Sequence, residues 1–242
     1  MTTVRKTYSY NDDNAALRAE GKPVMSFYVY QAMLRLWHWI TVLAVVVLCC
    51  TGYLIGKPLP TLSGEASAHF LMGYIRFAHF SAGYVLGVGL IFRIYWAFVG
   101  NRYAHEIFIV PIWDPQWWRE FFYELRWYLL LERYPRKYIG HNPVGQVAMF
   151  CFFVFAILMC LSGFAMYGEG LGWNSWAAHG FGWVISLVGG GNSLAVHSWH
   201  RLGMWAVVLF VMVHVYAAVR EDIMSKQSMI STMVSGFRMF KD

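Results

Sequence analysis

Charged residues are scarce in this 242-residue chain: Asp, Glu, Lys and Arg make up 13% of it, whereas 58% of its residues are hydrophobic and 19% aromatic. Because a soluble domain of this length has about one-quarter charged residues, the composition indicates an integral membrane protein. The net charge of +6 is spread around apolar runs and forms no basic patch, so a nucleic-acid partner is not expected.

Cysteine pairs and a cleavable leader are also missing. The four cysteines, Cys49, Cys50, Cys151 and Cys160, all lie within apolar runs, which excludes a disulfide framework and a metal knuckle. The first two dozen residues are polar and show no signal-peptide pattern. The first apolar run is therefore predicted to be a retained helix.

Four apolar runs are long enough to cross a bilayer, at residues 36–55, 74–99, 144–167 and 198–219. They predict an all-α fold, an integral membrane four-helix bundle within residues 31–225. Residues 1–30 are expected to form a polar N-terminal tail and residues 226–242 a C-terminal tail.

Lys and Arg are almost absent from two of the three loops. No Lys or Arg occurs from Tyr167 to Val196, and the first loop has only Lys57, with Arg76 at its edge. The two tails and the loop at 100–143 hold most of the others. By the positive-inside rule, both termini and that loop are cytoplasmic.

The cytoplasmic loop itself contains a helical pattern. Asp114-Pro115 is a favourable helix start, and aromatic and Leu residues follow at helical spacing from 117 to 129. We expect an amphipathic helix in the membrane interface; a partner-binding helix is the alternative. The outer loop at 168–196, rich in Gly and Trp, either caps the bundle or meets an external subunit.

Four histidines sort into two pairs by depth in the membrane. His200 and His214 are fourteen residues apart in one apolar run, so they rise roughly 21 Å and return to within about 40° of the same face. With the predicted topology, His79 and His200 lie on the outer side, and His38 and His214 on the inner side. Each pair joins two helices, as the two axial imidazoles of a six-coordinate haem iron require.

The histidine pattern predicts two haem b groups, bound without covalent links because no Cys-x-x-Cys-His motif occurs. The alternative is that the histidines are polar residues paired to neighbouring helices. His197 competes with His200 as a ligand, but it is turned roughly 100° from the face of His214. Solvated or hydrogen-bonded roles are expected for His69, His105, His141 and His179.

Three arginines and three glycines lie near the proposed ligands. Arg76 and Arg201 could pair with the propionates of an outer haem and Arg35 with those of an inner haem; interfacial snorkelling is the alternative. Small residues beside the ligands either leave room for a porphyrin or allow close helix packing. These small residues include Gly83, Gly87 and Gly203.

Segments between about residues 28 and 236 resemble the b-type cytochrome subunit of membrane-bound nickel–iron hydrogenases and, more distantly, the gamma subunit of respiratory formate dehydrogenases. Paired histidines are shared by several dihaem cytochromes b, whereas GNR at 100–102, HSWH at 197–200 and REDIM at 220–224 are particular to the hydrogenase branch. The full set is RLWHW at 35–39, MGYIRFAHFSAG at 72–83, RIYWAFVGNR at 93–102, GNS at 191–193, HSWHRLGMW at 197–205 and REDIMS at 220–225.

This resemblance implies a role in a hydrogen:quinone oxidoreductase of the bacterial cytoplasmic (inner) membrane. Such a multi-pass subunit, surrounded by lipid, anchors the hydrogenase small and large subunits on the periplasmic face. It passes electrons from the small subunit's iron–sulfur chain through haem b to the quinone pool. In that family the axial ligands match His38, His79, His200 and His214, and hydrogen chemistry belongs to the partner subunits.

Three other functions are compatible with the same residues. The chain could be the cytochrome b subunit of a formate dehydrogenase or a related periplasmic reductase. It could be a stand-alone transmembrane haem electron carrier. A haem-free anchor or transporter, in which the histidines carry protons, is the third.

Overall fold

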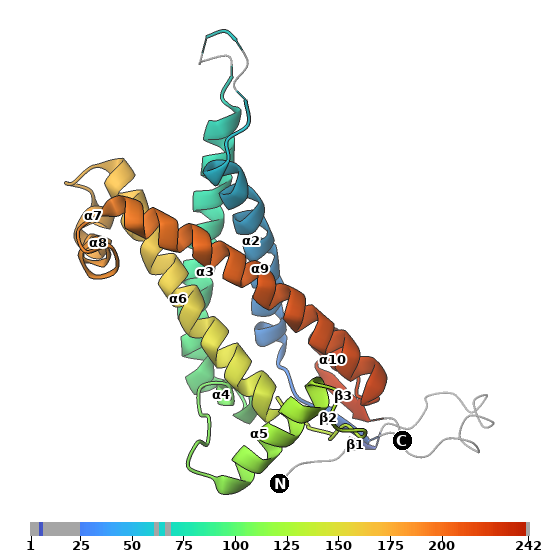
Figure 1. The fold of residues 1–242 in the computed structure, drawn as a ribbon. Coiled ribbons are helices and arrows are strands. Elements are labelled where there is room, and N and C mark those ends of the chain that lie inside the picture. The colour runs from blue at the N-terminus through green and yellow to red at the C-terminus, as the bar shows by residue number, and fades with distance from the viewer. Residues whose placement is uncertain (1–4, 7–24, 61–62, 66–68, 241–242) are drawn as a thin grey trace. The chain divides into compact units, whose positions relative to one another are not determined.

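Four long helices dominate the structure, a computed structural model that describes residues 5–6, 25–60, 63–65 and 69–240 (Figure 1). With 25 to 32 residues each, they are roughly 37 to 48 Å long, which exceeds the roughly 30 Å core of a bilayer. Among the residues described, these four are apolar enough to cross a membrane, as predicted. They are α2 (Ala32–Gly56), α3 (Leu71–Val99), α6 (Pro143–Leu171) and α9 (Ser193–Met224).

All four helices are longer than the apolar runs that predict them. Helix α9 begins at Ser193 rather than 198 and ends at Met224 rather than 219. Its extra turns contain polar residues, which end an apolar run but do not interrupt the backbone hydrogen bonds of a helix. The predicted ranges therefore mark the apolar part of each helix only.

The starts of two helices follow from local sequence. Helix α5 (Pro115–Tyr128) is the expected amphipathic helix, and the Asp114 carboxylate accepts a hydrogen bond from the Gln116 amide at 2.8 Å. Helix α6 starts with Pro143, and the Asn142 side chain accepts from the Gly145 amide at 2.6 Å. Both are N-caps followed by a proline whose missing N–H has no cost at a helix start.

The chain divides into two compact units, which are described separately. The bundle unit comprises residues 37–94 and 151–211, and the terminal unit comprises residues 1–36, 95–150 and 212–242. Most of the predicted N-terminal tail (1–4 and 7–24) lies outside the described residues.

In the bundle unit, segments of the four long helices present apolar side chains outward. Leu43, Val88, Ile91 and Leu209 are each more than 60% exposed, as expected for side chains that face lipid. The outer loop forms two short helices, α7 (Trp176–Phe181) and α8 (Trp183–Gly189). Val184 and Ile185 of α8 are buried with Ala165 and Val196, so this loop covers the ends of α6 and α9.

The terminal unit contains a small sheet that the sequence did not predict. Strands β1 (Arg5–Lys6), β2 (Met25–Tyr28) and β3 (Phe237–Phe240) are antiparallel in the order β1-β2-β3. Strands of two to four residues are too short to show an alternating apolar pattern, which explains the omission. Two short helices, α4 (Arg102–His105) and α10 (Met229–Ser235), complete the unit.

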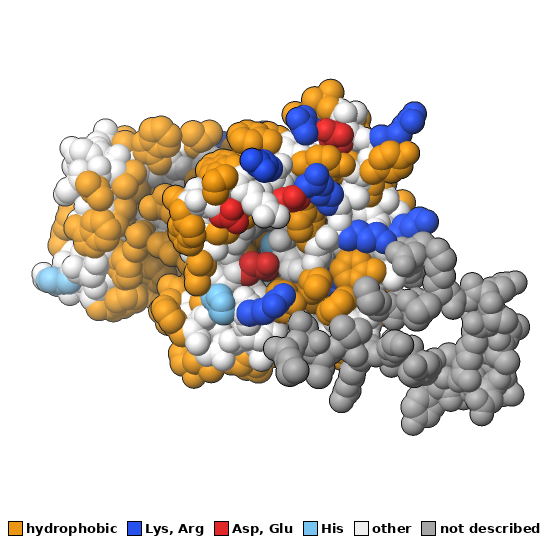
Figure 2. All heavy atoms as spheres, turned by 90° about the horizontal axis from the view of Figure 1, so that it is seen from below, with side chains coloured by type: hydrophobic (Ala, Val, Ile, Leu, Met, Phe, Trp, Pro, Cys, Tyr) orange, Lys and Arg blue, Asp and Glu red, His pale blue; other side chains and the backbone are white. Residues whose placement is uncertain are grey.

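The surface of the terminal unit is mixed in charge. Figure 2 shows Lys and Arg side chains beside Asp and Glu, with apolar side chains around them. One ion pair there joins Arg126 Nε to Glu132 Oε1 at 3.1 Å.

Candidate functional site

The bundle unit contains a cavity of about 820 Å³, lined by segments of α2, α3, α6 and α9. Its size lies in the upper part of the range of about 300–1,000 Å³ that is usual for ligand sites. Its lining is mainly apolar and includes His79, His200, Arg76 and Arg201. The structure therefore gathers the four residues predicted for the outer site at one cavity.

His79 is held by a hydroxyl group of the neighbouring helix α2. Thr51 Oγ1 lies 2.9 Å from His79 Nδ1 and donates its hydrogen to the Val47 carbonyl at 2.6 Å. Since a hydroxyl has a single hydrogen, Nδ1 of the imidazole must donate to Thr51. That tautomer leaves the lone pair on Nε2 available to a metal.

His200 has the same arrangement with helix α6. Ser162 Oγ lies 2.8 Å from His200 Nδ1 and donates to the Leu158 carbonyl at 2.9 Å. The imidazole again donates through Nδ1 and keeps its Nε2 lone pair. Iron-binding histidines commonly donate their other ring N–H in this way, which fixes the ring. The donor set therefore fits a haem iron that would be held by the Nε2 atoms of His79 and His200.

A glycine follows each hydroxyl residue and leaves space for the imidazole. A Cβ atom at Gly52 would lie 3.2 Å from His79 Cε1, and one at Gly163 would lie 3.3 Å from His200 Cε1. Both distances are tighter than most Cβ contacts, so a methyl group would press on the ring. These two hydroxyl–glycine pairs were not predicted from the sequence; a Thr-Gly or Ser-Gly dipeptide within an apolar run is the signal that could have indicated them.

The glycines singled out in the sequence have different roles. Gly83 lines the cavity, and a Cβ atom there would meet nothing within 4 Å. A Cβ atom at Gly203 would clash with Met159 Sδ, and one at Gly87 would lie 3.3 Å from the Phe164 ring. Gly83 thus leaves open space, whereas Gly87 and Gly203 allow close helix packing.

The competing ligand His197 also lines the cavity but has another partner. Its Nε2 lies 3.8 Å from Glu169 Oε2, and its side chain is 56% exposed. His200, by contrast, is only partly exposed and has the Ser162 hydroxyl behind it. The geometry favours His200 as the ligand.

The residues predicted for the inner site are divided between the two units. His38 is in α2 within the bundle unit, and His214 is in α9 within the terminal unit. Their pairing stays a prediction. Arg35 belongs to the terminal unit, where its guanidinium donates to the Val234 carbonyl.

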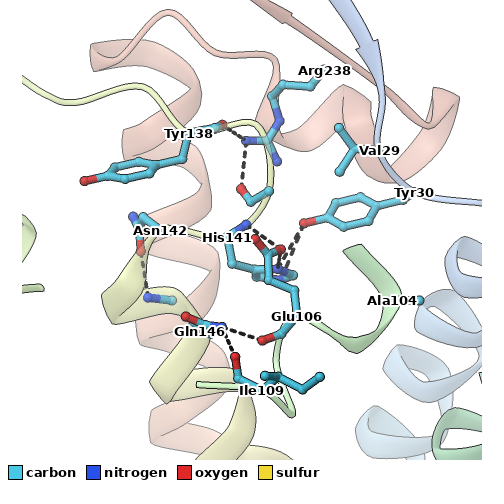
Figure 3. Close-up of polar contacts among 12 residues, drawn as sticks. Val29, Tyr30, Ala104, Glu106, Ile109, Tyr138, His141, Asn142, Gln146 and Arg238 are labelled. Carbon is cyan, nitrogen blue, oxygen red and sulfur yellow. Dashed lines mark hydrogen bonds and ion pairs between the residues drawn. The ribbon is translucent and has the colours of Figure 1, made fainter. Parts of the chain in front are cut away.

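A polar cluster in the terminal unit surrounds His141, as Figure 3 shows. His141 Nδ1 lies 3.2 Å from Glu106 Oε2, and the Tyr30 hydroxyl lies 3.4 Å from Nε2. Gln146 Nε2 donates to the Ile109 carbonyl at 3.1 Å. These contacts connect the segment before α2, the loop after α4 and the start of α6. His141 therefore has the hydrogen-bonded role expected from its position.

Comparison with known proteins gives consistent similarities over nearly the whole chain. Residues 29–236 match the family described as prokaryotic cytochrome b561. A protein of Azotobacter vinelandii named "Probable Ni/Fe-hydrogenase B-type cytochrome subunit" is 65% identical over 216 residues, 89% of each chain. One of the same name from Cupriavidus necator is 56% identical over 225 residues, 93% of this chain and 91% of that protein.

A third relative, from Escherichia coli K12, is named "Probable Ni/Fe-hydrogenase 1 B-type cytochrome subunit". It is 54% identical over 220 residues, which are 90% of this chain and 93% of that protein. The matched residues 29–236 include the lining of the cavity and most of the terminal unit.

Proposed function

Because the chain belongs to the prokaryotic cytochrome b561 family, a family of membrane helical bundles, we propose that it transfers electrons from a nickel–iron hydrogenase to quinone. It is a multi-pass membrane cytochrome b, and the names of its relatives identify hydrogenase subunits rather than formate dehydrogenase subunits. The hydrogen chemistry would belong to small and large partner subunits, whose iron–sulfur centres would donate the electrons.

The observation that supports this proposal most strongly is the matched pair of histidines at the cavity. His79 and His200 come from different helices, and each has its Nδ1 engaged by a hydroxyl group. They would hold the iron through Nε2, while Thr51 and Ser162 keep the rings oriented. A bound haem b supplies a centre that gains and loses one electron.

The two arginines at the cavity would hold the charged edge of the haem. Arg76 and Arg201 both line the cavity, and a Cβ atom at Gly56 would lie 3.4 Å from Arg201 Nε. Guanidinium groups bind carboxylates through charge-assisted hydrogen bonds, so they suit haem propionates. Their contribution would be to orient the haem and to raise its affinity for an electron.

We propose that His38 and His214 bind a second haem b on the other side of the membrane. His200 and His214 are both in α9, fourteen residues or roughly 21 Å apart. Two centres would divide the distance across a bilayer core of roughly 30 Å into shorter steps. Arg35 would serve the propionates of this inner haem.

The distribution of basic residues supports an orientation for the complex. No Lys or Arg occurs from Tyr167 to Val196, the segment that contains α7 and α8. By the positive-inside rule, this segment would lie on the periplasmic side of the cytoplasmic membrane, with both termini in the cytoplasm. Hydrogenase subunits would dock on the outer face, where Trp173, Trp176 and Trp183 are more than half exposed.

The test is a spectrum of membranes that contain this protein and its hydrogenase partners. Hydrogen should produce a reduced b-type signal close to that obtained with dithionite, and added quinone should reoxidise it. His200→Ala should remove the signal of the outer haem, whereas His179→Ala, at an exposed histidine of α7, should leave the spectrum unchanged. A dithionite signal that hydrogen cannot produce would overturn the hydrogenase role, and no b-type signal would overturn the haem sites.

A further inference from the structure

Helix α5 carries a carboxyl group on its buried face. Glu124 has no exposed surface, and Glu221 of α9 is 3% exposed. Both belong to the terminal unit. Carboxylates in such surroundings are costly unless cations pair with them or protons neutralise them.

The arginines of this cluster are bound to other acceptors. Arg220 donates to the Trp127 and Tyr128 carbonyls at 2.7 and 3.0 Å, and its guanidinium lies 4.1 Å from the Trp127 ring centroid. Arg136 pairs with Glu120, one turn before Glu124. Arg238 donates to the Tyr138 carbonyl at 3.1 Å. Cations are present, but their hydrogen bonds go elsewhere.

Neutral donors surround Glu221 instead. The Tyr128 hydroxyl donates to Glu221 Oε1 at 2.8 Å, and Asn142 Nδ2 donates to the same oxygen at 3.3 Å. Asn142 Nδ2 also lies 2.9 Å from the Tyr128 hydroxyl. These contacts stabilise one ionised carboxylate. Because the charge of Glu221 acts on the buried Glu124, both groups cannot be ionised at low cost.

The pKa values agree with this geometry. Burial, followed by the negative charge of Glu221, raises the pKa of Glu124 to about 7; the charge of Glu120 adds to this, while the charge of Arg136 opposes it. Burial and the charge of Glu221 also raise the pKa of the Tyr128 hydroxyl, so that it stays a donor. Glu120 differs: burial raises its pKa, but hydrogen bonds from Arg136 and Tyr138 lower it overall.

The position of Glu221 connects this pair to the proposed inner haem. His214 and Glu221 are seven residues apart in α9, which places them about 10 Å apart along the helix and within about 20° of the same face. An electron that arrives near His214 adds negative charge there. In a buried site of low dielectric, that charge strengthens the binding of a proton by nearby carboxylates.

We propose that Glu124 and Glu221 form a site for one shared proton, which exchanges with the aqueous phase near neutral pH, is taken up as the neighbouring redox centre is reduced and is released as that centre is reoxidised. The exchange rests on the proposed electron-transfer function; the shared proton does not. When the site is deprotonated, the arrival of one electron draws one proton into it from the aqueous phase. When the electron passes to quinone, the site releases that proton to the quinone as well. Two such cycles deliver the two electrons and two protons that convert a quinone into a quinol.

The shared proton is tested by infrared titration of the full chain in its complex with the hydrogenase subunits. The oxidised wild-type protein should show the C=O band of a buried protonated carboxyl that disappears as the pH rises through about 7. Glu124→Gln should remove this band, and the matched variant Glu120→Gln, one turn away, should retain it. A wild-type protein without the band, or a band that persists in Glu124→Gln, overturns the site.

The exchange is tested by redox titration of the b-type haems at several pH values. In the wild type, one midpoint potential should fall as the pH rises between about 6 and 8, and in Glu124→Gln this dependence should be reduced at least several-fold. Glu120→Gln should keep it. An unchanged pH dependence in Glu124→Gln overturns the coupling, even if the infrared band confirms the shared proton. A complex without b-type haem would contradict the proposed function instead, and the infrared titration would still decide the proton site.

Discussion

Ser162 Oγ lies 2.8 Å from His200 Nδ1. Because the serine hydroxyl donates its hydrogen to the Leu158 carbonyl, the imidazole is the donor in the hydrogen bond between Ser162 and His200. The serine is on α6, the one long helix that contains no histidine. Helix α6 therefore takes part in the cofactor site without a ligand of its own. Thr51 of α2 repeats the arrangement for His79.

Removal of these hydroxyl groups should weaken haem binding. Ser162→Ala and Thr51→Val remove the hydroxyl oxygen that accepts from the imidazole N–H, so the ring loses a contact that fixes its orientation. Loss of such a supporting hydrogen bond typically lowers metal affinity about 10- to 100-fold. Haem content per polypeptide and the b-type spectrum measure the effect. Ser235→Ala, which removes a comparable hydroxyl in α10, should change neither.

A methyl group at Gly163 should displace the His200 ring. In Gly163→Ala, the new Cβ atom would lie 3.3 Å from His200 Cε1, so the imidazole must tilt or move by a few tenths of an ångström. We expect a shifted low-spin haem spectrum and lower haem retention during purification. The control is Gly180→Ala in α7, where a Cβ atom would meet nothing within 4 Å. Equal spectra for the two variants would contradict the packing argument.

Loss of the cavity arginines should make the outer haem harder to reduce. Arg76→Gln combined with Arg201→Gln removes two positive charges from the cavity lining, and these charges favour the more negative, reduced state. The expected fall in midpoint potential is on the order of 59 mV, a tenfold change in a one-electron equilibrium. Potentiometric titration of the b-type signal measures it. An unchanged midpoint potential would mean that both arginine side chains only extend to the membrane–water interface and do not act on the haem.

Stability should depend on pH through Glu124. Its pKa is raised from 4.5 to about 7 in the folded chain, so the folded chain binds the proton more tightly than the unfolded chain. The stabilisation that comes from this tighter proton binding is fully present below pH 4.5 and is lost as the pH rises through 7. The change in the free energy of unfolding is up to about 3 kcal/mol. Glu124→Gln should flatten this dependence in thermal unfolding of detergent-solubilised protein followed at pH 5 and pH 8.

The contribution of Glu120 to stability should depend on pH in the opposite direction, so Glu120 provides the control. Its lowered pKa means that its contribution to stability is present at neutral pH and is lost as the pH falls through that lowered value. Because the Glu120 and Arg136 side chains are partly exposed, the effect should be small. A Glu120→Gln variant that became more stable at pH 8 would contradict this assignment.

The sequence predicts the long elements well, and it singles out two histidines that the structure brings to one cavity, for physical reasons. Runs of twenty or more apolar residues have few alternatives to a spanning helix, and the spacing along α3 and α9 brings His79 and His200 to one cavity. The amphipathic helix α5 is equally clear, because its aromatic residues recur at helical spacing after a good N-cap.

What the sequence does not predict depends on contacts between distant segments. Thr51 and Ser162 look like ordinary hydroxyls bonded to their own helices, and only the fold shows that each also accepts from a histidine. Glu124 follows the polar pattern of α5, yet it is buried because α5 lies against residues nearly a hundred positions further along the chain. The strands are too short to give a pattern at all.

The hydroxyl–glycine pairs also bear on how the cofactor enters the protein. With Nδ1 already donating to Thr51 or Ser162, each imidazole holds its proton away from the atom that would bind iron. Insertion of haem then needs neither a change of tautomer nor the release of a proton from either ring, in contrast to sites that must deprotonate their ligands first. The apoprotein would thus form a receptive cavity before haem arrives, and the rate of loading would be set by access between the helices rather than by acid–base chemistry.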